Sequence, residues 1–253
     1  MGRVGSLAVF LVAVLVVGGC ATQRVPLAAG QQQLSAKPPV AKLKPGAQRE
    51  EPAVLPTWTV VKPSKPALDL KSPLAPVELF AKVSPAVYIV RATRDAKPSA
   101  LQGSAVAVSA SEAITNCHIV THAKAITVSK GAVALPAEVI SADRQSDRCY
   151  LKVRDGTLDY VLGLRDFSDL SIGETVYTIG SPKGLDRTFA QGLLSGLRRM
   201  DGVEYIQISA PVSEGSSGGG LFDNKGNLIG ITTFTMKGSQ NLNFAIAASE
   251  YWK

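Results

Sequence analysis

The chain has 253 residues, of which 45% are hydrophobic, and this length allows a globular part with a substantial core. Its formal net charge is +7, but nine of the 27 Lys and Arg residues and three of the 20 acidic residues lie within residues 1–76. The remaining 18 basic and 17 acidic residues leave residues 77–253 nearly neutral. The charge therefore indicates a basic, solvated segment beside an anionic membrane surface, and it excludes nucleic-acid binding as the main function.

The first twenty residues are typical of an exported protein. Arg3 precedes a continuous apolar run, Leu7–Val17, which is too short to span a bilayer and has the length of a signal-peptide core. The run leads into the letters VGGC at Cys20, which resemble a bacterial lipobox. We expect residues 1–19 to be a lipoprotein signal peptide and the thiol of Cys20 to be lipidated, which would hold the chain at the periplasmic face of the outer membrane of a bacterial envelope. An ordinary signal peptide with an incidental Cys is the alternative.

A linker and then a globular domain are expected after this segment. Residues 20–73 are rich in Pro, Lys, Ala and Gln and lack a periodic apolar pattern, so we expect a disordered, lipid-anchored linker there. The composition then changes, and we place a globular domain at residues 74–253. Apolar spacing over Val77–Val83 predicts a short amphipathic helix, which a Ser-Pro pair ends.

Short β-type runs separated by turn residues follow this helix, and long helical patterns are absent from the rest of the sequence. The expected strands are Ala86–Thr93, Ser104–Val108, Ala113–Asn116, Ala125–Ser129, Ala132–Ser141, Cys149–Val153, Thr175–Gly180, Arg187–Leu197, Tyr205–Ile208, Gly219–Phe222, Leu228–Phe234 and Leu242–Ala247. A dozen short strands with almost no helix signal predict an all-β fold made of barrels or a sandwich.

The sequence offers the three groups of a nucleophilic serine hydrolase: a hydroxyl, an imidazole base and a carboxylate that orients the base. His118 comes at the end of a strand pattern in the letters TNCHIV, and His122 lies in the following turn or short helix. Asp147 opens a strand in SDRCYLKV, where a carboxylate can point into a cleft, whereas Asp143 has the setting of a turn residue. An Asx turn is the alternative for either Asp.

Ser217 lies in a glycine-rich segment, GSSGGG, between two apolar runs. Glycines let successive backbone N–H groups converge on a substrate carbonyl oxygen, and we expect the N–H groups of Gly215 and Ser217 to form an oxyanion hole. A flexible Gly/Ser loop is the alternative. The segment also fits the pattern G-x-S-x-G, but that arrangement needs a His after the Ser, and here the order is His118, Asp147, Ser217.

Together, and in this order, the motifs resemble trypsin-like serine proteases of the HtrA/Deg kind. The resemblance covers most of residues 77–253 and includes TNCHIV, SDRCYLKV, IGSPKGL, QGLLSGLRR, APVSEGSSGGGLFDNKGNLIGITTF and NLNFAIA. It implies a chymotrypsin-like fold of two six-stranded antiparallel β-barrels, at about residues 84–160 and 172–250, with the active site between them.

Within this resemblance His118, Asp147 and Ser217 are the catalytic triad. The sequence departs from the family at Ser216, where Asn is usual, and at Gly220, where Pro is usual, and neither change removes a catalytic group. Ser216 cannot pair with a newly cut N-terminus, so zymogen cleavage of that type is not expected. The sequence ends soon after NLNFAIA, so PDZ domains are not expected either.

The resemblance also suggests a substrate pocket. Pro211 would lie near its base, Thr233, Phe234 and Thr235 along one wall, and Leu242 along another. The stretch QISAPVS around the base contains no acidic residue, so nothing supports a preference for Arg or Lys. We expect a small, mainly apolar pocket.

The two remaining cysteines, Cys117 and Cys149, adjoin the proposed acid–base pair. A hydrogen bond between His118 and Asp147 would bring them close enough for a disulfide, which an exported protein can form. Two buried free thiols are the alternative.

The sequence therefore predicts a serine endopeptidase that cleaves proteins or peptides through an acyl-enzyme intermediate and is tethered to the bacterial envelope. The alternative is a chaperone-like or binding module on a resting or inactive protease scaffold. No cofactor is expected, and two His with few clustered acids give no metal-ligand set. The sequence leaves the oligomeric state open.

Overall fold

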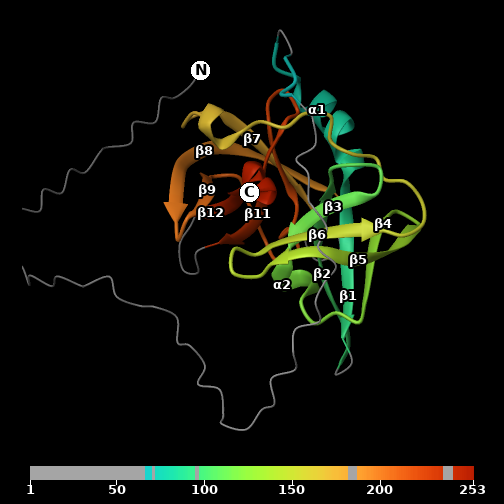
Figure 1. The fold of residues 1–253 in the computed structure, drawn as a ribbon. Helices are drawn as coiled ribbons and strands as arrows, with labels where there is room; N and C mark the ends of the chain where they lie inside the picture. The colour runs from blue at the N-terminus through green and yellow to red at the C-terminus, as the bar shows by residue number, and fades with distance from the viewer. Residues whose placement is uncertain (1–65, 70–71, 95–96, 182–186, 236–241) are drawn as a thin grey trace, which may run out of the picture. The chain divides into compact units, whose positions relative to one another are not determined.

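The computed structural model of the protein describes residues 66–69, 72–94, 97–181, 187–235 and 242–253. Within these ranges, twelve strands form two closed barrels of six antiparallel strands each (Figure 1). The all-β fold with two six-stranded barrels, expected from the sequence, is confirmed. No helix in these ranges has both the length and the apolar character needed to cross a membrane.

The first barrel consists of β1 to β6, which run from green to yellow in Figure 1. These strands are β1 (Val87–Arg94), β2 (Lys97–Ala107), β3 (Glu112–Asn116), β4 (Ala125–Lys130), β5 (Val133–Asp143) and β6 (Arg148–Val153). They pair in the order β1-β2-β3-β6-β5-β4, and β4 closes the barrel by pairing with β1. Because β3 pairs with β6 up to Asn116 opposite Arg148, the end of β3 and the start of β6 lie side by side.

The second barrel consists of β7 to β12, drawn in orange to red. These strands are β7 (Thr175–Gly180), β8 (Thr188–Met200), β9 (Val203–Ile208), β10 (Gly220–Asp223), β11 (Leu228–Thr235) and β12 (Asn243–Ala247). They pair in the order β10-β11-β12-β9-β8-β7, and β7 closes this barrel by pairing with β10.

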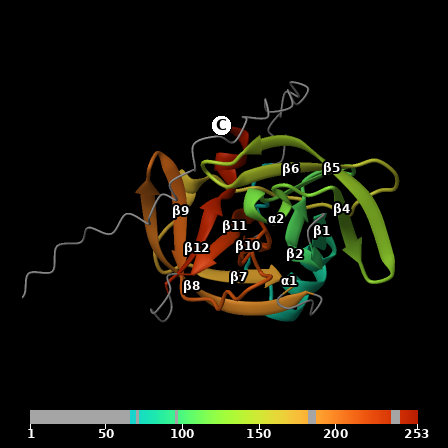
Figure 2. The ribbon, with the colours of Figure 1, turned by 90° about the horizontal axis from the view of Figure 1, so that it is seen from below.

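Each of the twelve runs predicted from the sequence overlaps one of these strands, but some ends differ. β2 begins earlier, at Lys97, and β8 continues to Met200. Residues Cys117–Val120, expected at the end of a strand, form a single turn of helix, α2. Seen from below, α2 lies on the side of the first barrel that faces β11 (Figure 2).

Three clusters of buried apolar side chains stabilise the barrels. One includes Val90 and Leu151 of the first barrel, and another includes Leu194 and Ile229 of the second. The third combines side chains from both barrels, among them the fully buried Phe222. Because burial of apolar surface is the dominant favourable term in folding, this shared cluster holds the two barrels together.

The helix α1 (Pro76–Val83) packs its apolar face on this shared cluster. Leu79 is fully buried, and the ring of Phe80 meets that of Phe189 on β8 edge to face, with centroids 5.4 Å apart. The segment before this helix also contacts the second barrel, because the N–H of Leu68 donates to Oδ1 of Asn227 at 2.6 Å. Leu68 falls within the segment expected to be a disordered linker.

Replacing Leu79 with Ala should lower the free energy of unfolding by about 2–5 kcal/mol, because the side chain is fully buried and its removal leaves a cavity. Urea unfolding of the purified chain measures this loss. Val77 lies on the same helix and is 80% exposed, so Val77→Ala is the matched control. It should change the free energy of unfolding by less than about 0.5 kcal/mol. Equal effects of the two substitutions would contradict the packing of α1.

Candidate active site

His118 is positioned by the end of β3 and by a close contact beneath α2. β3 ends at Asn116 and α2 begins at the next residue, so His118 is the second residue of this helical turn. Ile119 packs onto Gly103 of β2, where an added Cβ would lie 2.4 Å from Ile119 Cδ1. Glycine at this position therefore lets α2 approach the barrel. The side chain of His118 remains 52% exposed, so its outer edge is open to a ligand.

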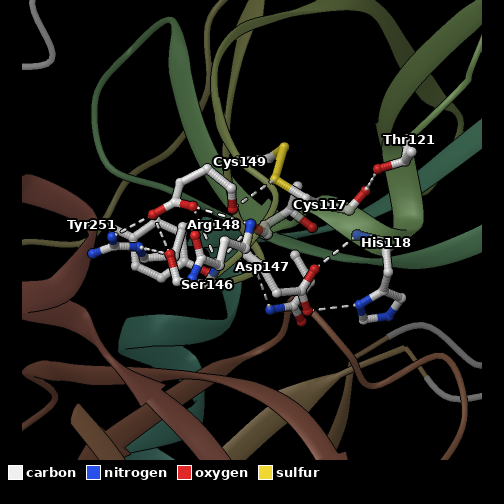
Figure 3. Close-up of a disulfide and its surroundings, with 12 residues drawn as sticks. Cys117, His118, Thr121, Ser146, Asp147, Arg148, Cys149 and Tyr251 are labelled. Carbon is white, nitrogen blue, oxygen red and sulfur yellow. Dashed lines mark hydrogen bonds and ion pairs between the residues drawn. A yellow bond between two sulfur atoms is a disulfide. The ribbon is translucent and has the colours of Figure 1, made fainter. Parts of the chain in front are cut away.

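Asp147 lies in the turn between β5 and β6, one residue before the strand that it was expected to open. Its φ of +59° is in the left-handed region, which Asp tolerates better than most residues. Its carboxylate accepts two hydrogen bonds from His118: Oδ1 from the backbone N–H and Oδ2 from ring Nδ1, both at 2.8 Å (Figure 3). This arrangement holds the proton on Nδ1 and leaves Nε2 as the acceptor of the ring.

A disulfide between Cys117 and Cys149 lies beside this pair (Figure 3). It joins the residue before His118 to the second residue after Asp147, with the two Cα atoms 4.9 Å apart, and both half-cystines are buried. The structure thus contains the disulfide that the sequence led us to expect. The bond ties α2 to the start of β6, in addition to the pairing of β3 with β6.

The turn that carries Asp147 is organised by Asp143, the last residue of β5. Oδ1 of Asp143 accepts the N–H groups of Gln145 and Ser146, and its Oδ2 accepts the hydroxyl of Ser146 and Nη2 of Arg148. Burial alone would raise the pKa of this carboxyl, but the hydrogen bonds from Ser146 and Arg148 outweigh burial and lower the pKa from 3.8 to about 2. Asp143 therefore forms the Asx turn that the sequence allowed for it.

Arg148, at the start of β6, connects this turn to the helix η4 (Ala248–Trp252). Nη1 of Arg148 donates to the backbone O of Glu250 and, at 3.0 Å, to its Oε2, and the Glu250 side chain is only 2% exposed. The hydroxyl of the buried Tyr251 donates to the backbone O of Thr115 on β3 at 3.1 Å. η4 is thus bonded to both strands whose ends carry His118 and Asp147.

Ser217 lies between β9 and β10, and its hydroxyl donates to the backbone O of Thr233 on β11 at 3.0 Å. Oγ1 of Thr233 donates in turn to Oδ2 of Asp147 at 3.2 Å. Thr233, expected only as a pocket wall, therefore contacts both Asp147 and Ser217. Among the described residues, no hydrogen bond joins Ser217 to His118.

Ser104 of β2 holds the Ser217 segment against the first barrel. Its N–H donates to the backbone O of Ser217 at 2.8 Å, and its Oγ donates to the backbone O of Gly215 at 3.0 Å. Gly218 has a φ of +84°, and an added Cβ there would lie 1.9 Å from the backbone O of Ser104. Glycine at this position is therefore needed for packing against Ser104. This reason adds to the one inferred from the sequence, which is that glycines let backbone N–H groups converge on a substrate.

The N–H groups of Gly215 and Ser217 donate to no acceptor within the described part of the chain. Their neighbours differ, because the N–H of Ser216 donates to Ser213 O at 2.9 Å and that of Gly218 donates to Thr232 O at 2.8 Å. Two amides on either side of Ser216 are therefore available to an external oxygen.

The residues expected to form the substrate pocket lie around the paired ends of β11 and β12. Oγ1 of Thr235 donates to Oδ1 of Asn243 on β12 at 2.8 Å. Phe234 is 39% exposed and offers an apolar surface there. Pro211 and Leu242 lie in the segments that lead into β10 and β12. The strand pairing thus brings Thr235 and Phe234 next to the start of β12.

The lipidation site and metal binding are the remaining points that the sequence analysis addressed. Cys20, the proposed lipidation site, lies outside the described residues. Within the ranges that the structure describes, no group of three or more His, Cys, Asp or Glu side chains is placed to hold a metal ion.

A family model described as the trypsin-like peptidase domain matches residues 103–231, just over half of the chain. The chain belongs to the trypsin-like peptidase family. The match includes β3, the β5–β6 turn and the Ser217 segment, so all the residues proposed as catalytic lie within it.

Similar proteins place the chain with HtrA-type proteins. It is 39% identical over 141 residues to a probable periplasmic serine endoprotease DegP-like of Halomonas elongata, a match that covers 53% of this chain and 30% of that protein. It is 32% identical over 165 residues to the periplasmic pH-dependent serine endoprotease DegQ of Escherichia coli, covering 61% of this chain and 36% of the relative. The chain therefore spans about a third of the length of these relatives.

A solved structure of the HtrA-type protease AlgW with a tripeptide superposes with a TM-score of 0.64 at 29% identity, over 70% of this chain and 61% of that chain. The HtrA-type, trypsin-like character expected from the motifs is confirmed.

Asp143→Asn should destabilise the protein near neutral pH, because the variant loses the charge that Arg148 and Ser146 bind. A carboxyl whose pKa is lower in the folded than in the unfolded chain contributes stability above about pH 4 and loses this contribution as the pH falls through about 2. The difference in melting temperature between wild type and variant should therefore shrink from pH 5 to pH 2.

The exposed Asp155→Asn serves as the control for the general loss of a negative charge. A melting-temperature difference for Asp143→Asn that stays constant across this pH range would contradict the assignment.

Proposed function

We propose that the chain is a serine endopeptidase in which Ser217 is the nucleophile, His118 the general base and Asp147 the carboxylate that orients the base. The observation that carries the proposal is the pair of 2.8 Å hydrogen bonds by which Asp147 holds both the ring and the backbone of His118. Relatives named serine endoproteases support the reaction class.

In the proposed reaction, Nε2 of His118 takes the hydroxyl proton of Ser217 while Oγ attacks the carbonyl carbon of a peptide bond. The N–H groups of Gly215 and Ser217 donate to the carbonyl oxygen as it becomes negatively charged. His118 then gives the proton to the leaving amine, the carbon–nitrogen bond breaks, and an acyl-enzyme forms on Ser217. Water deprotonated by the same imidazole attacks the ester, releases the acid and restores the hydroxyl, while Asp147 stabilises each imidazolium.

The hydroxyl of Ser217 must first leave the carbonyl of Thr233. A rotation about the Cα–Cβ bond of Ser217 breaks this hydrogen bond, at a net cost of about 0.5–1.5 kcal/mol, and turns Oγ away from β11. This bond is also the one observation that favours the second candidate function, a binding module on a resting protease scaffold.

We further propose that proteins or peptides are the substrates and that the chain acts in the bacterial envelope. The relatives of the chain named periplasmic endoproteases and the structural neighbour with a bound tripeptide support this proposal. The tether would be a lipid on Cys20, which the VGGC letters support.

A fluorophosphonate probe should label the wild-type chain and leave Ser217→Ala and His118→Ala unlabelled, because only an activated hydroxyl attacks the phosphorus. Ser216→Ala removes the neighbouring hydroxyl and should leave the labelling intact. The readout is the mass of the adduct and the rate at which it forms. A folded wild type that stays unlabelled would refute an active site at rest and would support the binding-module alternative.

A further inference from the structure

Arg148, the first residue of β6, carries a charge that is almost enclosed. Only 15% of its side chain is exposed, and its guanidinium donates hydrogen bonds in three directions. Nε donates to Oγ of Ser146 at 2.9 Å, and Nη2 donates to Oδ2 of Asp143 at 2.6 Å. Nη1 donates to the backbone O and, at 3.0 Å, to Oε2 of Glu250 on η4. Because a guanidinium is a rigid planar fork, these bonds together fix where the β5–β6 turn lies relative to η4.

These bonds surround Asp147, the residue just before Arg148. The bond from Arg148 to Ser146 spans Asp147, because it joins the residues on either side of it. Figure 3 shows both neighbours on the side of Asp147 that faces away from His118. The φ of +59° at Asp147 is uncommon for a residue other than glycine, and such a backbone persists only where surrounding contacts hold it. The N–H of Cys117 holds the backbone O of Asp147 at 3.2 Å from the side of β3, and Arg148 supplies the restraint from the other side.

Glu250 gives Arg148 an anchor that is fixed to the second barrel. Its side chain is 2% exposed, and its Oε1 accepts the N–H of Glu204 on β9 at 3.2 Å as well as Nζ of Lys253. A carboxylate enclosed to this degree needs a paired cation, because removal of the partner leaves a buried charge without compensation. Arg148 and Glu250 therefore depend on each other, and a change on η4 would be felt at the turn that carries Asp147.

Stability alone does not account for this ion pair. Apolar side chains of similar size often replace a buried ion pair without loss of stability. Their contacts have no direction, however, whereas the hydrogen bonds between a guanidinium and a carboxylate set distances and angles on both sides. The turn that these bonds fix is the one whose carboxylate lies 2.8 Å from ring Nδ1 of His118. The pair thus provides the directional contacts that orienting Asp147 requires.

We propose that Arg148 is a positioning residue for the proposed reaction. Its guanidinium, anchored on Glu250, holds the β5–β6 turn so that the carboxylate of Asp147 meets His118. Arg148 acts through Asp147, so it is not itself a catalytic residue. The proposal rests on the proposed function for its effect on the reaction rate, and it adds a residue to which the sequence motifs assigned no role.

Three variants of the full chain separate position from stability. Arg148→Lys keeps the charge and loses the planar fork. Arg148→Met removes the charge and leaves Glu250 without its Arg partner. Adding Glu250→Gln to Arg148→Met removes that unpaired charge, and the amide oxygen of Gln can still accept the N–H of Glu204. Each variant is measured for melting temperature, for the rate of fluorophosphonate labelling and for the proton resonance of ring Nδ1–H of His118, which a short hydrogen bond shifts downfield.

We expect Arg148→Lys to be labelled roughly tenfold to a hundredfold more slowly than the wild type, because a small displacement of a catalytic group slows a reaction this much. Arg148→Met should be labelled as slowly and should also lose melting temperature. Adding Glu250→Gln should recover part of the melting temperature and none of the labelling rate. In all three variants the downfield resonance of the hydrogen bond to Asp147 should move upfield or disappear. Arg154→Lys, at a 66%-exposed Arg that pairs with Glu138, is the matched control and should change none of these readouts.

Labelling of Arg148→Lys at the wild-type rate would overturn the proposal. So would recovery of labelling together with melting temperature in the double variant, because Arg148 would then only stabilise the fold. An unchanged resonance in Arg148→Lys and Arg148→Met would overturn it as well. The resonance needs no catalysis, so it decides the positioning of Asp147 even where the wild type is not labelled, a result that would refute the active site of the proposed function.

Discussion

The two hydrogen bonds between His118 and Asp147 are the constraint on which the rest of the site depends. They form only if the end of β3 lies beside the β5–β6 turn, and the antiparallel register that sets Asn116 opposite Arg148 provides this neighbourhood. The disulfide of Cys117 adds a covalent link between the same two elements. A carboxylate with two hydrogen bonds to one residue fixes both the position and the ring tautomer of that residue. In the proposed reaction, the imidazole therefore needs no further reorganisation before it accepts a proton.

A second set of contacts brings the Ser217 segment, which belongs to the other barrel, to this pair. Ser104 bonds the backbone of Ser217 from the first barrel, while Thr233 bonds Asp147 from the second. The apolar cluster shared by the two barrels holds the strands that carry Ser104 and Thr233 close to each other. η4 reinforces the arrangement through Tyr251, which crosses to β3. The site is therefore a product of the junction and belongs to neither barrel by itself.

The sequence could predict most of the fold, because alternating apolar residues between turn signals identify strands without any knowledge of their partners. It left open whether a turn or a short helix follows β3, because the single helical turn α2 is too short to show a helical period. The left-handed backbone of Asp147 left no signal either, since Asp is common in ordinary turns. Sequence motifs sufficed to nominate His118, Asp147 and Ser217, but they did not show that the hydroxyl of Ser217 donates to Thr233.

Contacts between distant positions account for the rest of what the sequence missed. Thr233 and Asp147 are 86 residues apart, and no local pattern links them. Ser104 and Gly215 are 111 residues apart, and they are bonded to each other only because the two barrels pack together. The residue types in a motif thus indicate which chemistry is available, whereas the tertiary fold determines which further side chains surround the site.

The central claim is tested most directly by proton NMR of the ring Nδ1–H of His118 in water at low temperature. A short hydrogen bond from this group to Asp147 protects the proton from exchange and shifts its resonance far downfield. The account predicts such a resonance in the wild type, its retention in His122→Ala and its loss in Asp147→Asn. A wild-type spectrum without the resonance, or its persistence after Asp147→Asn, would contradict the account.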